Sequence, residues 1–315
     1  MNIGGNMKVA VSVVAFSKNE QLVKELIRNF PDSKINSEGK RIQKNELAEY
    51  YKGAEAIIVG LEKIDDELLS LLPDLKIIAK YGVGLDNIDL EACNKRGIEV
   101  GWTAGVNKHA VAEMTLGFML MLSRNLYLTS NQLKTGLWNR SGGNSLLVKT
   151  IGIIGLGHIG KEVVRLLTPI GSKLLCNDIL DVSSFALENQ IQVVGKEEIY
   201  KSSDIISVHT PLTELTRNMI NKEAMILMKS STFIINSARG GIINEEDLKW
   251  ALKNQIIAGA ALDVYNEEPP IDHELLEMPN LICTPHIGGN SYEAVVAMGM
   301  SAIEHLLKFQ NSKGN

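Results

Sequence analysis

Cysteine is scarce in this 315-residue sequence: there are three, and no two of them form a Cys-x-x-Cys pair. Because the number is odd and the pair is missing, the sequence indicates neither a disulfide framework nor a zinc site. Such usage is typical of a reducing compartment. We therefore expect a cytoplasmic protein that holds no metal.

The sequence also lacks a strong excess of either charge, and it lacks long apolar runs. With 37 acidic and 32 basic residues the net charge is -5, so the overall field attracts neither a nucleic-acid backbone nor an anionic membrane. No apolar run approaches the ~18 residues that a spanning helix needs. Residues 9–16 have the length of a signal-peptide core but lack a small-residue cleavage pattern, which favours a first β-strand. The expected partner is therefore a small molecule.

The length predicts two domains of ordinary size, and 45% hydrophobic with 22% charged residues is typical of globular proteins. Short β-branched runs alternate with segments of helical period, which predicts an α/β fold of doubly wound parallel sheets. The predicted strands form two groups, at 9–15, 56–59, 76–79 and 98–101, and at 150–154, 173–176, 205–209, 232–236, 258–264 and 281–284. Long amphipathic helices are predicted over residues 107–135 and 292–309.

A glycine-rich turn follows the first strand of the second group. The sequence Ile-Gly-Ile-Ile-Gly-Leu-Gly-His-Ile-Gly places Gly155, Gly157 and Gly160 in the G-x-G-x-x-G register of dinucleotide-binding turns. The first glycine permits the tight turn, the second lets the backbone approach a pyrophosphate, and the third lets helix and strand pack closely. The alternative is that the three glycines only close the turn between strand and helix and bind no dinucleotide. The residues between the last two glycines, also expected along the cofactor, are His158 and Ile159.

The next predicted strand leads to Asp178, close to the separation from the glycines expected for the acid that binds the ribose 2′-hydroxyl. Its charge would repel a 2′-phosphate, and no arginine follows directly to accept one, so NAD is favoured over NADP. Asp181 is a weaker candidate for the same role. The structural alternative for Asp178 is a loop cap.

Four later strands of the second group are followed by polar residues, namely His209 and Thr210 (with Pro211 directly after them), Arg239, Asp263 with Glu268, and His286. Ligands of open parallel sheets bind beyond the carboxyl ends of the strands. An imidazole can move a hydroxyl proton, a carboxylate beside it can fix its tautomer, and a guanidinium can hold a substrate carboxylate. The set therefore fits hydride transfer between nicotinamide and a carbinol carbon, although each residue taken singly could be structural.

The motifs at residues 81–89, 155–160, 208–213, 236–241, 261–269 and 284–289 resemble those of the D-isomer-specific 2-hydroxyacid dehydrogenases, the phosphoglycerate dehydrogenase-like branch in particular. The resemblance implies that Arg239 binds the substrate carboxylate and carbonyl, that Glu268 orients the base, and that His286 is the general acid/base. It also implies contacts with the dinucleotide, which we expect from His209, Thr210, Pro211, Ala238 and Asp263, the last of them at the nicotinamide carboxamide. His209 is a rival candidate for the base.

The resemblance further implies a discontinuous layout. Residues 1–103 plus 288–315 would form a flavodoxin-like substrate-binding domain, into which a Rossmann NAD-binding domain, residues 104–287, is inserted. The two crossings would then serve as a hinge. A homodimer formed through the helix that contains residues 111–124 is also implied.

Glycines on both sides of Val83 would let the N–H groups of Val83 and Gly84 meet a substrate carboxylate. The phosphoglycerate dehydrogenase branch has a basic residue where this chain has Lys80, and that residue faces the substrate phosphate. We hypothesise that Lys80 binds a second anionic group; the alternative is a solvated lysine on a strand edge. The expected substrate is a small 2-hydroxy or 2-keto acid, with 3-phosphoglycerate among the candidates.

Two other functions use a similar scaffold. The C-terminal-binding-protein corepressors share a similar Arg, Glu and His set and act as NAD(H)-sensing scaffolds, and turnover of 2-keto acids would separate them from an enzyme. A formate- or phosphite-type dehydrogenase is the third alternative. Pro285 before His286, together with the intact catalytic set, favours the hydroxyacid chemistry.

Overall fold

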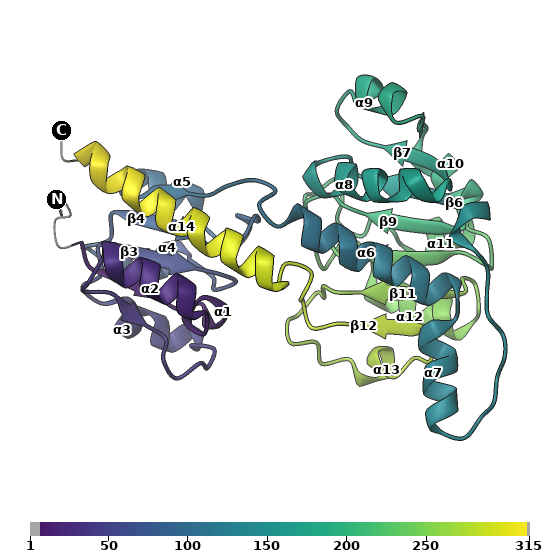
Figure 1. The fold of residues 1–315 in the computed structure, drawn as a ribbon, viewed down its shortest axis with the longest axis horizontal. Coiled ribbons are helices and arrows are strands. Elements are labelled where there is room, and N and C mark those ends of the chain that lie inside the picture. The colour runs from purple at the N-terminus through teal and green to yellow at the C-terminus, as the bar shows by residue number, and fades with distance from the viewer. Residues whose placement is uncertain (1–6, 314–315) are drawn as a thin grey trace. The chain divides into compact units, whose positions relative to one another are not determined.

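The computed structural model describes residues 7–313, which form two compact units (Figure 1). The first unit comprises the chain up to Asn107 together with the segment that begins at Gly289, and the second unit is Lys108–Gly288. Within the described residues, no helix combines the length and apolar character required to cross a membrane.

The first unit is built on a five-stranded parallel sheet with the order β2-β1-β3-β4-β5, a flavodoxin-like order. Its strands are β1 (Val9–Val11), β2 (Lys34–Ile35), β3 (Ala56–Val59), β4 (Ile77–Lys80) and β5 (Glu99–Gly101). Its helices are α1 (Val14–Ser17), α2 (Glu20–Asn29), η1 (Lys44–Glu46), α3 (Leu47–Tyr51), α4 (Asp66–Ser70), α5 (Leu90–Lys95) and α14 (Tyr292–Lys313). Every residue of β3 and β4 is buried, as expected when helices cover both faces of a parallel sheet.

The second unit has a seven-stranded parallel sheet with the order β12-β11-β10-β9-β6-β7-β8. Its strands are β6 (Thr150–Ile154), β7 (Lys173–Asn177), β8 (Gln192–Val193), β9 (Ile205–Val208), β10 (Phe233–Asn236), β11 (Gly259–Leu262) and β12 (Leu281–Cys283). Its helices are α6 (Lys108–Ser123), α7 (Leu126–Lys134), η2 (Leu146–Val148), α8 (His158–Leu167), η3 (Thr168–Ile170), α9 (Ser183–Glu188), α10 (Lys196–Ser202), α11 (Lys222–Ile226), α12 (Glu245–Lys253) and α13 (His273–Leu276). The strand order reverses between β6 and β9, and ligands of Rossmann sheets bind at this switch point.

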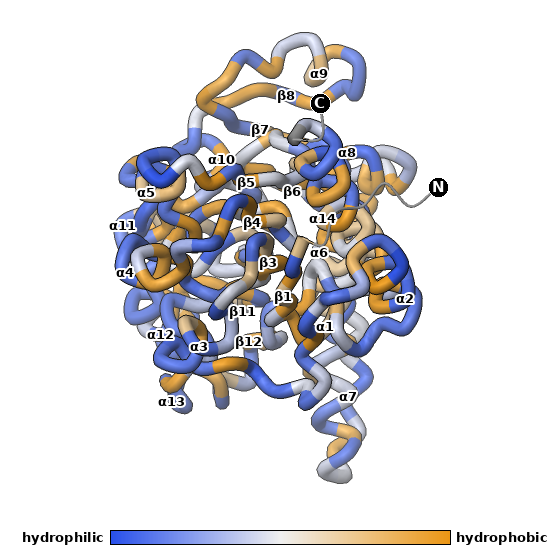
Figure 2. The backbone as a smooth tube through the Cα atoms, turned by 90° about the vertical axis from the view of Figure 1, so that its left-hand side faces the viewer, coloured by the Kyte–Doolittle hydropathy of each residue, from blue (hydrophilic) through white to orange (hydrophobic). Residues whose placement is uncertain are grey.

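Alternate strand residues supply two hydrophobic cores on opposite faces of the second sheet. Ile153 and Ile235 belong to one core, whereas Ile154 and Ile234 belong to the other, because successive side chains of a strand point to opposite faces. Figure 2 shows the matching pattern on helices such as α2, where hydrophobic and hydrophilic stretches alternate. Several helices begin at a side-chain cap that accepts a backbone N–H, namely Asn19, Asp65, Asp89, Asn221, Asn244 and Asp272.

The structure confirms the α/β class and the two parallel sheets, and it corrects three details. The strand expected over residues 9–15 ends at Val11, because α1 begins at Val14. The single helix expected over 107–135 is wrong: Asn125 adopts a left-handed backbone conformation (φ 53°) between α6 and α7. The short strands β2 and β8 were not predicted, because two partly or fully exposed residues carry no apolar periodicity.

Candidate active site

The glycine turn between β6 and α8 has the geometry of an anion-binding turn. Gly155 has a φ of 97°, and a Cβ at Gly160 would lie 2.0 Å from the carbonyl oxygen of Gly155, so both positions require glycine. A Cβ at Gly157 would meet nothing within 4 Å. Gly157 caps α8 without a side-chain hydrogen bond, so the N–H groups of the first helical turn, which begins with His158 and Ile159, suit a pyrophosphate.

Asp178 joins the end of β7 to this turn. Its Oδ2 accepts the N–H of Leu156 at 2.6 Å, and its Oδ1 accepts the N–H of Leu180 at 2.9 Å. The carboxylate therefore caps the loop and also lies at the glycine turn. Asp181 is exposed and instead accepts the N–H of Ser183, so the structure brings Asp178, not Asp181, to the turn.

His209 and Thr210 follow β9 and lie against the turn, since a Cβ at Gly155 would come within 3 Å of both residues. His209 is buried, its Nε2 lies 2.8 Å from the Ser207 hydroxyl, and burial lowers its pKa to about 3. Within the described residues, His209 Nδ1 and Thr210 Oγ1 are buried without hydrogen-bond partners. A neutral, buried ring is poorly suited to be the general acid/base, whereas unsatisfied polar atoms beside the turn fit a bound dinucleotide.

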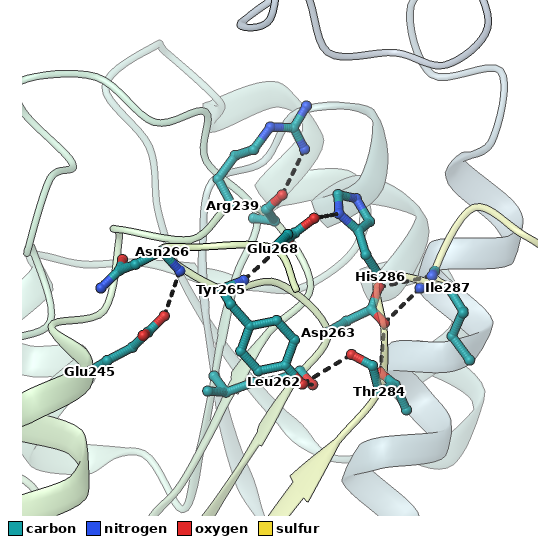
Figure 3. A network of polar contacts seen from close by, with 12 residues as sticks. Arg239, Glu245, Leu262, Asp263, Tyr265, Asn266, Glu268, Thr284, His286 and Ile287 are labelled. Atoms are coloured by element: carbon teal, nitrogen blue, oxygen red, sulfur yellow. Dashed lines mark hydrogen bonds and ion pairs between the residues drawn. The ribbon is translucent and has the colours of Figure 1, made fainter. Parts of the chain in front are cut away.

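The three residues expected to carry the chemistry come together at the sheet edge (Figure 3). His286 Nδ1 lies 2.7 Å from Glu268 Oε2, and Glu268 Oε1 accepts the N–H of Tyr265 at 3.2 Å. Arg239 lies on the other side of Glu268 and donates from Nη1 to the carbonyl of Ala238 at 2.7 Å. About a quarter of the His286 and Glu268 side chains is exposed (28% and 26%). A guanidinium, a carboxylate and an imidazole from three separate loops are therefore accessible to a ligand.

Glu268 is negatively charged in this environment. Burial alone would raise its pKa, but the hydrogen bond and the charge of His286, the N–H of Tyr265 and the charge of Arg239 together hold the pKa below its ordinary value. An ionised carboxylate only accepts hydrogen bonds, so the hydrogen shared with Glu268 belongs to His286 Nδ1. In the part of the chain that the structure describes, His286 Nε2 has no hydrogen-bond partner. Nε2 is thus the ring atom that can exchange a proton with a ligand.

Local contacts bring the Arg239 and Glu268 loops together. Asn236, at the end of β10, accepts the N–H of Ala238 and donates to the carbonyl of Arg239, which closes a tight turn. A Cβ at Gly240 would lie 1.8 Å from the carbonyl oxygen of Tyr265, so only glycine permits this approach of the two backbones. The loop that contains Glu268 is therefore held against the Arg239 turn.

Asp263 has a role that the sequence interpretation missed. It is 1% exposed and accepts hydrogen bonds from the Thr284 hydroxyl at 2.6 Å and from the N–H groups of Ile287 and Gly288 at 2.8 Å each. These bonds flank His286, whose backbone is left-handed with a φ of 54°. The carboxylate thus fixes the loop that carries the base; its contact with the carboxamide stays a prediction. The sequence feature that could have indicated this role is an acidic residue at the end of a buried strand, because a buried charge must be hydrogen-bonded.

The remaining predicted residues lie in the first unit. Val83 and Gly84 are partly exposed, and no residue that the structure describes accepts a hydrogen bond from their N–H groups. Lys80 is 4% exposed and donates to the carbonyl of Gly60 and to Asn87 Oδ1. The alternative of a solvated lysine is therefore wrong. The described residues contain no group of three His, Cys, Asp or Glu that could hold a metal ion.

Comparisons with known proteins agree with this geometry. The family model of the D-isomer specific 2-hydroxyacid dehydrogenase NAD binding domain matches residues 116–288. A hydroxypyruvate reductase of Thermotoga maritima is 36% identical over 299 residues, 92% of this chain and 96% of that protein. A D-3-phosphoglycerate dehydrogenase of Methanocaldococcus jannaschii is 39% identical over 271 residues, 85% of this chain but only 52% of that protein. A D-lactate dehydrogenase of Aquifex aeolicus, solved with NAD and lactic acid, is 29% identical with a TM-score of 0.84 over 98% of both chains.

An open glycine turn at the switch point and an imidazole–carboxylate pair at the same sheet edge define an NAD-dependent oxidoreductase that acts on CH–OH groups. The chain belongs to the D-isomer specific 2-hydroxyacid dehydrogenase family. The family expected from the motifs is thereby confirmed.

Glu268→Gln should keep the fold but lower kcat for keto-acid reduction about tenfold, because a neutral amide can no longer stabilise the imidazolium by its charge. Initial rates of keto-acid reduction at saturating NADH give kcat and check this. The matched control is Glu267→Gln, since Glu267 is exposed and adjacent. An unchanged kcat in Glu268→Gln would remove Glu268 from the proton-transfer pair.

Asp178→Ala should lower kcat/KM with NADH by about 10- to 100-fold and with NADPH much less, because a charged ribose acceptor is lost and the repulsion of a 2′-phosphate is relieved. Initial rates with both coenzymes give the ratio of kcat/KM with NADH to kcat/KM with NADPH. Asp181→Ala, at the exposed neighbouring carboxylate, should leave that ratio unchanged. If the ratio moves only in Asp181→Ala, the ribose assignment is wrong.

Proposed function

We propose that this protein interconverts a small 2-keto acid and its D-2-hydroxy acid, with Arg239 as the substrate ligand, His286 as the general acid/base and Glu268 as the residue that orients it. The observation that carries the proposal is the 2.7 Å contact of His286 Nδ1 with Glu268 Oε2 beside Arg239. This arrangement leaves Nε2 for the substrate oxygen. Its charges match an anionic 2-keto acid whose carbonyl needs a proton.

The residue chemistry follows from these charges. In the direction of reduction, the Arg239 guanidinium holds the substrate carboxylate and polarises the adjacent carbonyl. His286 Nε2 donates a proton to the carbonyl oxygen, and ionised Glu268 stabilises the imidazolium that exists before the transfer. When bound at the glycine turn, NADH would supply the hydride for C2, and NAD would accept it in the reverse direction. In that reverse direction, neutral His286 takes the proton from the hydroxyl.

The proposed cofactor ligands are the residues at and beside the glycine turn, namely Gly155, Gly157, His158, Ile159, Gly160, Asp178, His209, Thr210, Pro211, Ala238 and Asp263. The two unsatisfied buried atoms, His209 Nδ1 and Thr210 Oγ1, support this set. We further propose that residues 104–287 form the NAD-binding domain and that residues 1–103 with 288–315 form the substrate-binding domain. The N–H groups of Val83 and Gly84, which no described residue accepts, support a second contact with the substrate carboxylate.

His286→Ala should lower kcat by about two to four orders of magnitude and leave the Kd for NADH within about threefold, because it removes a proton donor and no proposed cofactor ligand. NADH oxidation with glyoxylate, pyruvate and hydroxypyruvate measures the rate, and fluorescence titration measures the Kd. The control is His273→Ala, at an exposed histidine of α13.

Near-normal turnover in His286→Ala would contradict the assigned base. Absence of turnover in the unmodified protein with every 2-keto acid would instead favour the NAD(H)-sensing scaffold.

We also propose that two copies pair through α6, the helix that the resemblance implies, and that the exposed apolar side chains of α7 extend this interface. Four large apolar side chains are at least half exposed within a short stretch of α7 and the segment after it: Leu126, Leu133, Leu137 and Trp138. Several large exposed apolar side chains in one short stretch favour an interaction surface there, and the family resemblance makes a second copy the expected occupant.

The chain should therefore sediment as a dimer at about 10 μM, and Trp138→Glu should weaken the dimer at least tenfold, because it buries an unpaired charge. Analytical ultracentrifugation gives the mass. Leu187→Glu is the control, since Leu187 is 83% exposed on α9, away from this stretch in the sequence. A monomeric unmodified chain would contradict the proposal.

The compartment that we propose is the cytoplasm. Its support is that Cys93, Cys176 and Cys283 are all free, without a disulfide. Burial raises the pKa of Cys93 and of Cys176 to about 11, so these thiols suit a reducing environment in which they need no partner.

A further inference from the structure

Lys80, the last residue of β4, is enclosed by polar groups of its own unit. Its side chain is 4% exposed, and its ammonium donates to the carbonyl of Gly60 and to Asn87 Oδ1, the latter at 2.6 Å. A buried ammonium is tolerated when such acceptors replace water. Lys80 therefore has the surroundings of a structural cation.

Asn87 completes a cluster that we call the Lys80 clamp, which consists of Gly60, Glu62, Lys80 and Asn87. The Asn87 side-chain amide donates to the carbonyls of Gly60, at 3.1 Å, and of Glu62. Glu62 in turn accepts the N–H of Gly60 at 2.6 Å through Oε2. The clamp thus ties the loop after β3 to the loop after β4.

The clamp holds both ends of the segment that contains Val83 and Gly84. Lys80 stands two residues before Gly82, and Asn87 follows three residues after Gly84, where its carbonyl also accepts the N–H of Ile64 at 2.8 Å. Gly82 has a φ of 131°, and a Cβ there would lie 3.4 Å from Lys80 Cε. The lysine stem therefore lies beneath the glycine that turns the two N–H groups outward, so the clamp determines how they are presented.

The same contacts oppose a phosphate at Lys80. A phosphate would have to enter the enclosed surroundings of an ammonium that solvent barely reaches and that already donates to the carbonyl of Gly60 and to Asn87 Oδ1. It would also bring up to two negative charges towards Glu62, whose carboxylate is hydrogen-bonded to the Gly60 N–H. The energetic cost of both steps favours substrates without that group.

We propose that Lys80 is a positioning residue that orders the Val83–Gly84 segment, and that the preferred substrate is a short 2-keto acid with a neutral substituent on C2, such as hydrogen or hydroxymethyl, not a phosphorylated one. The inference rests on the proposed function. It replaces the hypothesis that Lys80 binds a second anionic group, and the contacts of the ammonium are the reason.

The substrate test compares hydroxypyruvate with 3-phosphohydroxypyruvate, which differ only in the phosphate. The unmodified full chain with NADH should show kcat/KM at least about 100-fold higher for hydroxypyruvate. Equal or higher efficiency with the phosphorylated acid would overturn the inference and leave the proposed function standing. No turnover with either acid, or with glyoxylate, would overturn the proposed function itself.

The clamp is tested with Lys80→Met, which keeps the stem and removes the charge. KM should rise about tenfold for both acids while kcat stays within about threefold, because the carboxylate-binding segment is loosened and the acid/base pair is untouched. The matched control is Lys63→Met: Lys63 is 69% exposed in the loop after β3 and lies outside the clamp. A loss confined to the phosphorylated acid in Lys80→Met would show that Lys80 binds the phosphate.

A circular dichroism melt shows whether Lys80→Met folds. If it does not, Asn87→Ala gives an independent result. It breaks the clamp and leaves the ammonium in place, so KM should again rise about tenfold for both acids. A phosphate-binding Lys80 would instead be released by this change, and efficiency with 3-phosphohydroxypyruvate would hold or increase. That second outcome would contradict the proposed role of Lys80 as a positioning residue.

Discussion

A buried carboxylate at the end of β11 determines where the proton-transferring imidazole lies. Asp263 is almost fully buried, and a charge removed from water persists only when its oxygens are hydrogen-bonded. Its partners lie before and after His286 in one short loop, so satisfying the charge also fixes the path of that loop. The constraint supports the left-handed backbone of His286, which costs free energy in a residue other than glycine. Glu268 then only has to orient a ring that is already placed.

Strand pairing explains why residues distant in the sequence meet at this edge. Val208, Asn236, Leu262 and Cys283 are aligned across β9, β10, β11 and β12. Each strand is parallel to its neighbour, so the loops that follow these four residues leave the sheet at the same level. The close approach of Gly240 to the carbonyl of Tyr265 then sets how near the Arg239 turn comes to the Glu268 loop. The geometry of the site therefore depends on the register of these four strands and on Gly240.

Features that depend on local conformation or on apolar periodicity could be predicted from the sequence. The glycine turn and the alternation of strands with helices belong here, and they correctly predicted both parallel sheets. Partners across the fold could not be predicted, because spacing does not reveal which carbonyl a buried group meets: the roles of Asp263 and Lys80 are examples. The break between α6 and α7 at Asn125 could not be predicted for another reason: a single left-handed residue leaves the apolar pattern of its flanking helices intact.

Lys80 and Arg239 show why a basic residue at a strand end does not by itself indicate an anion site. Both occur at or after the end of a buried strand, but the acceptors around Lys80 enclose its compact ammonium. A guanidinium carries five N–H groups in a fixed plane, so the hydrogen bond from Arg239 Nη1 to the Ala238 carbonyl orients the whole group. Arg239 also stays partly exposed beside an ionised Glu268. An oriented and partly exposed guanidinium suits a substrate carboxylate, whereas an enclosed ammonium suits the loop that it stabilises.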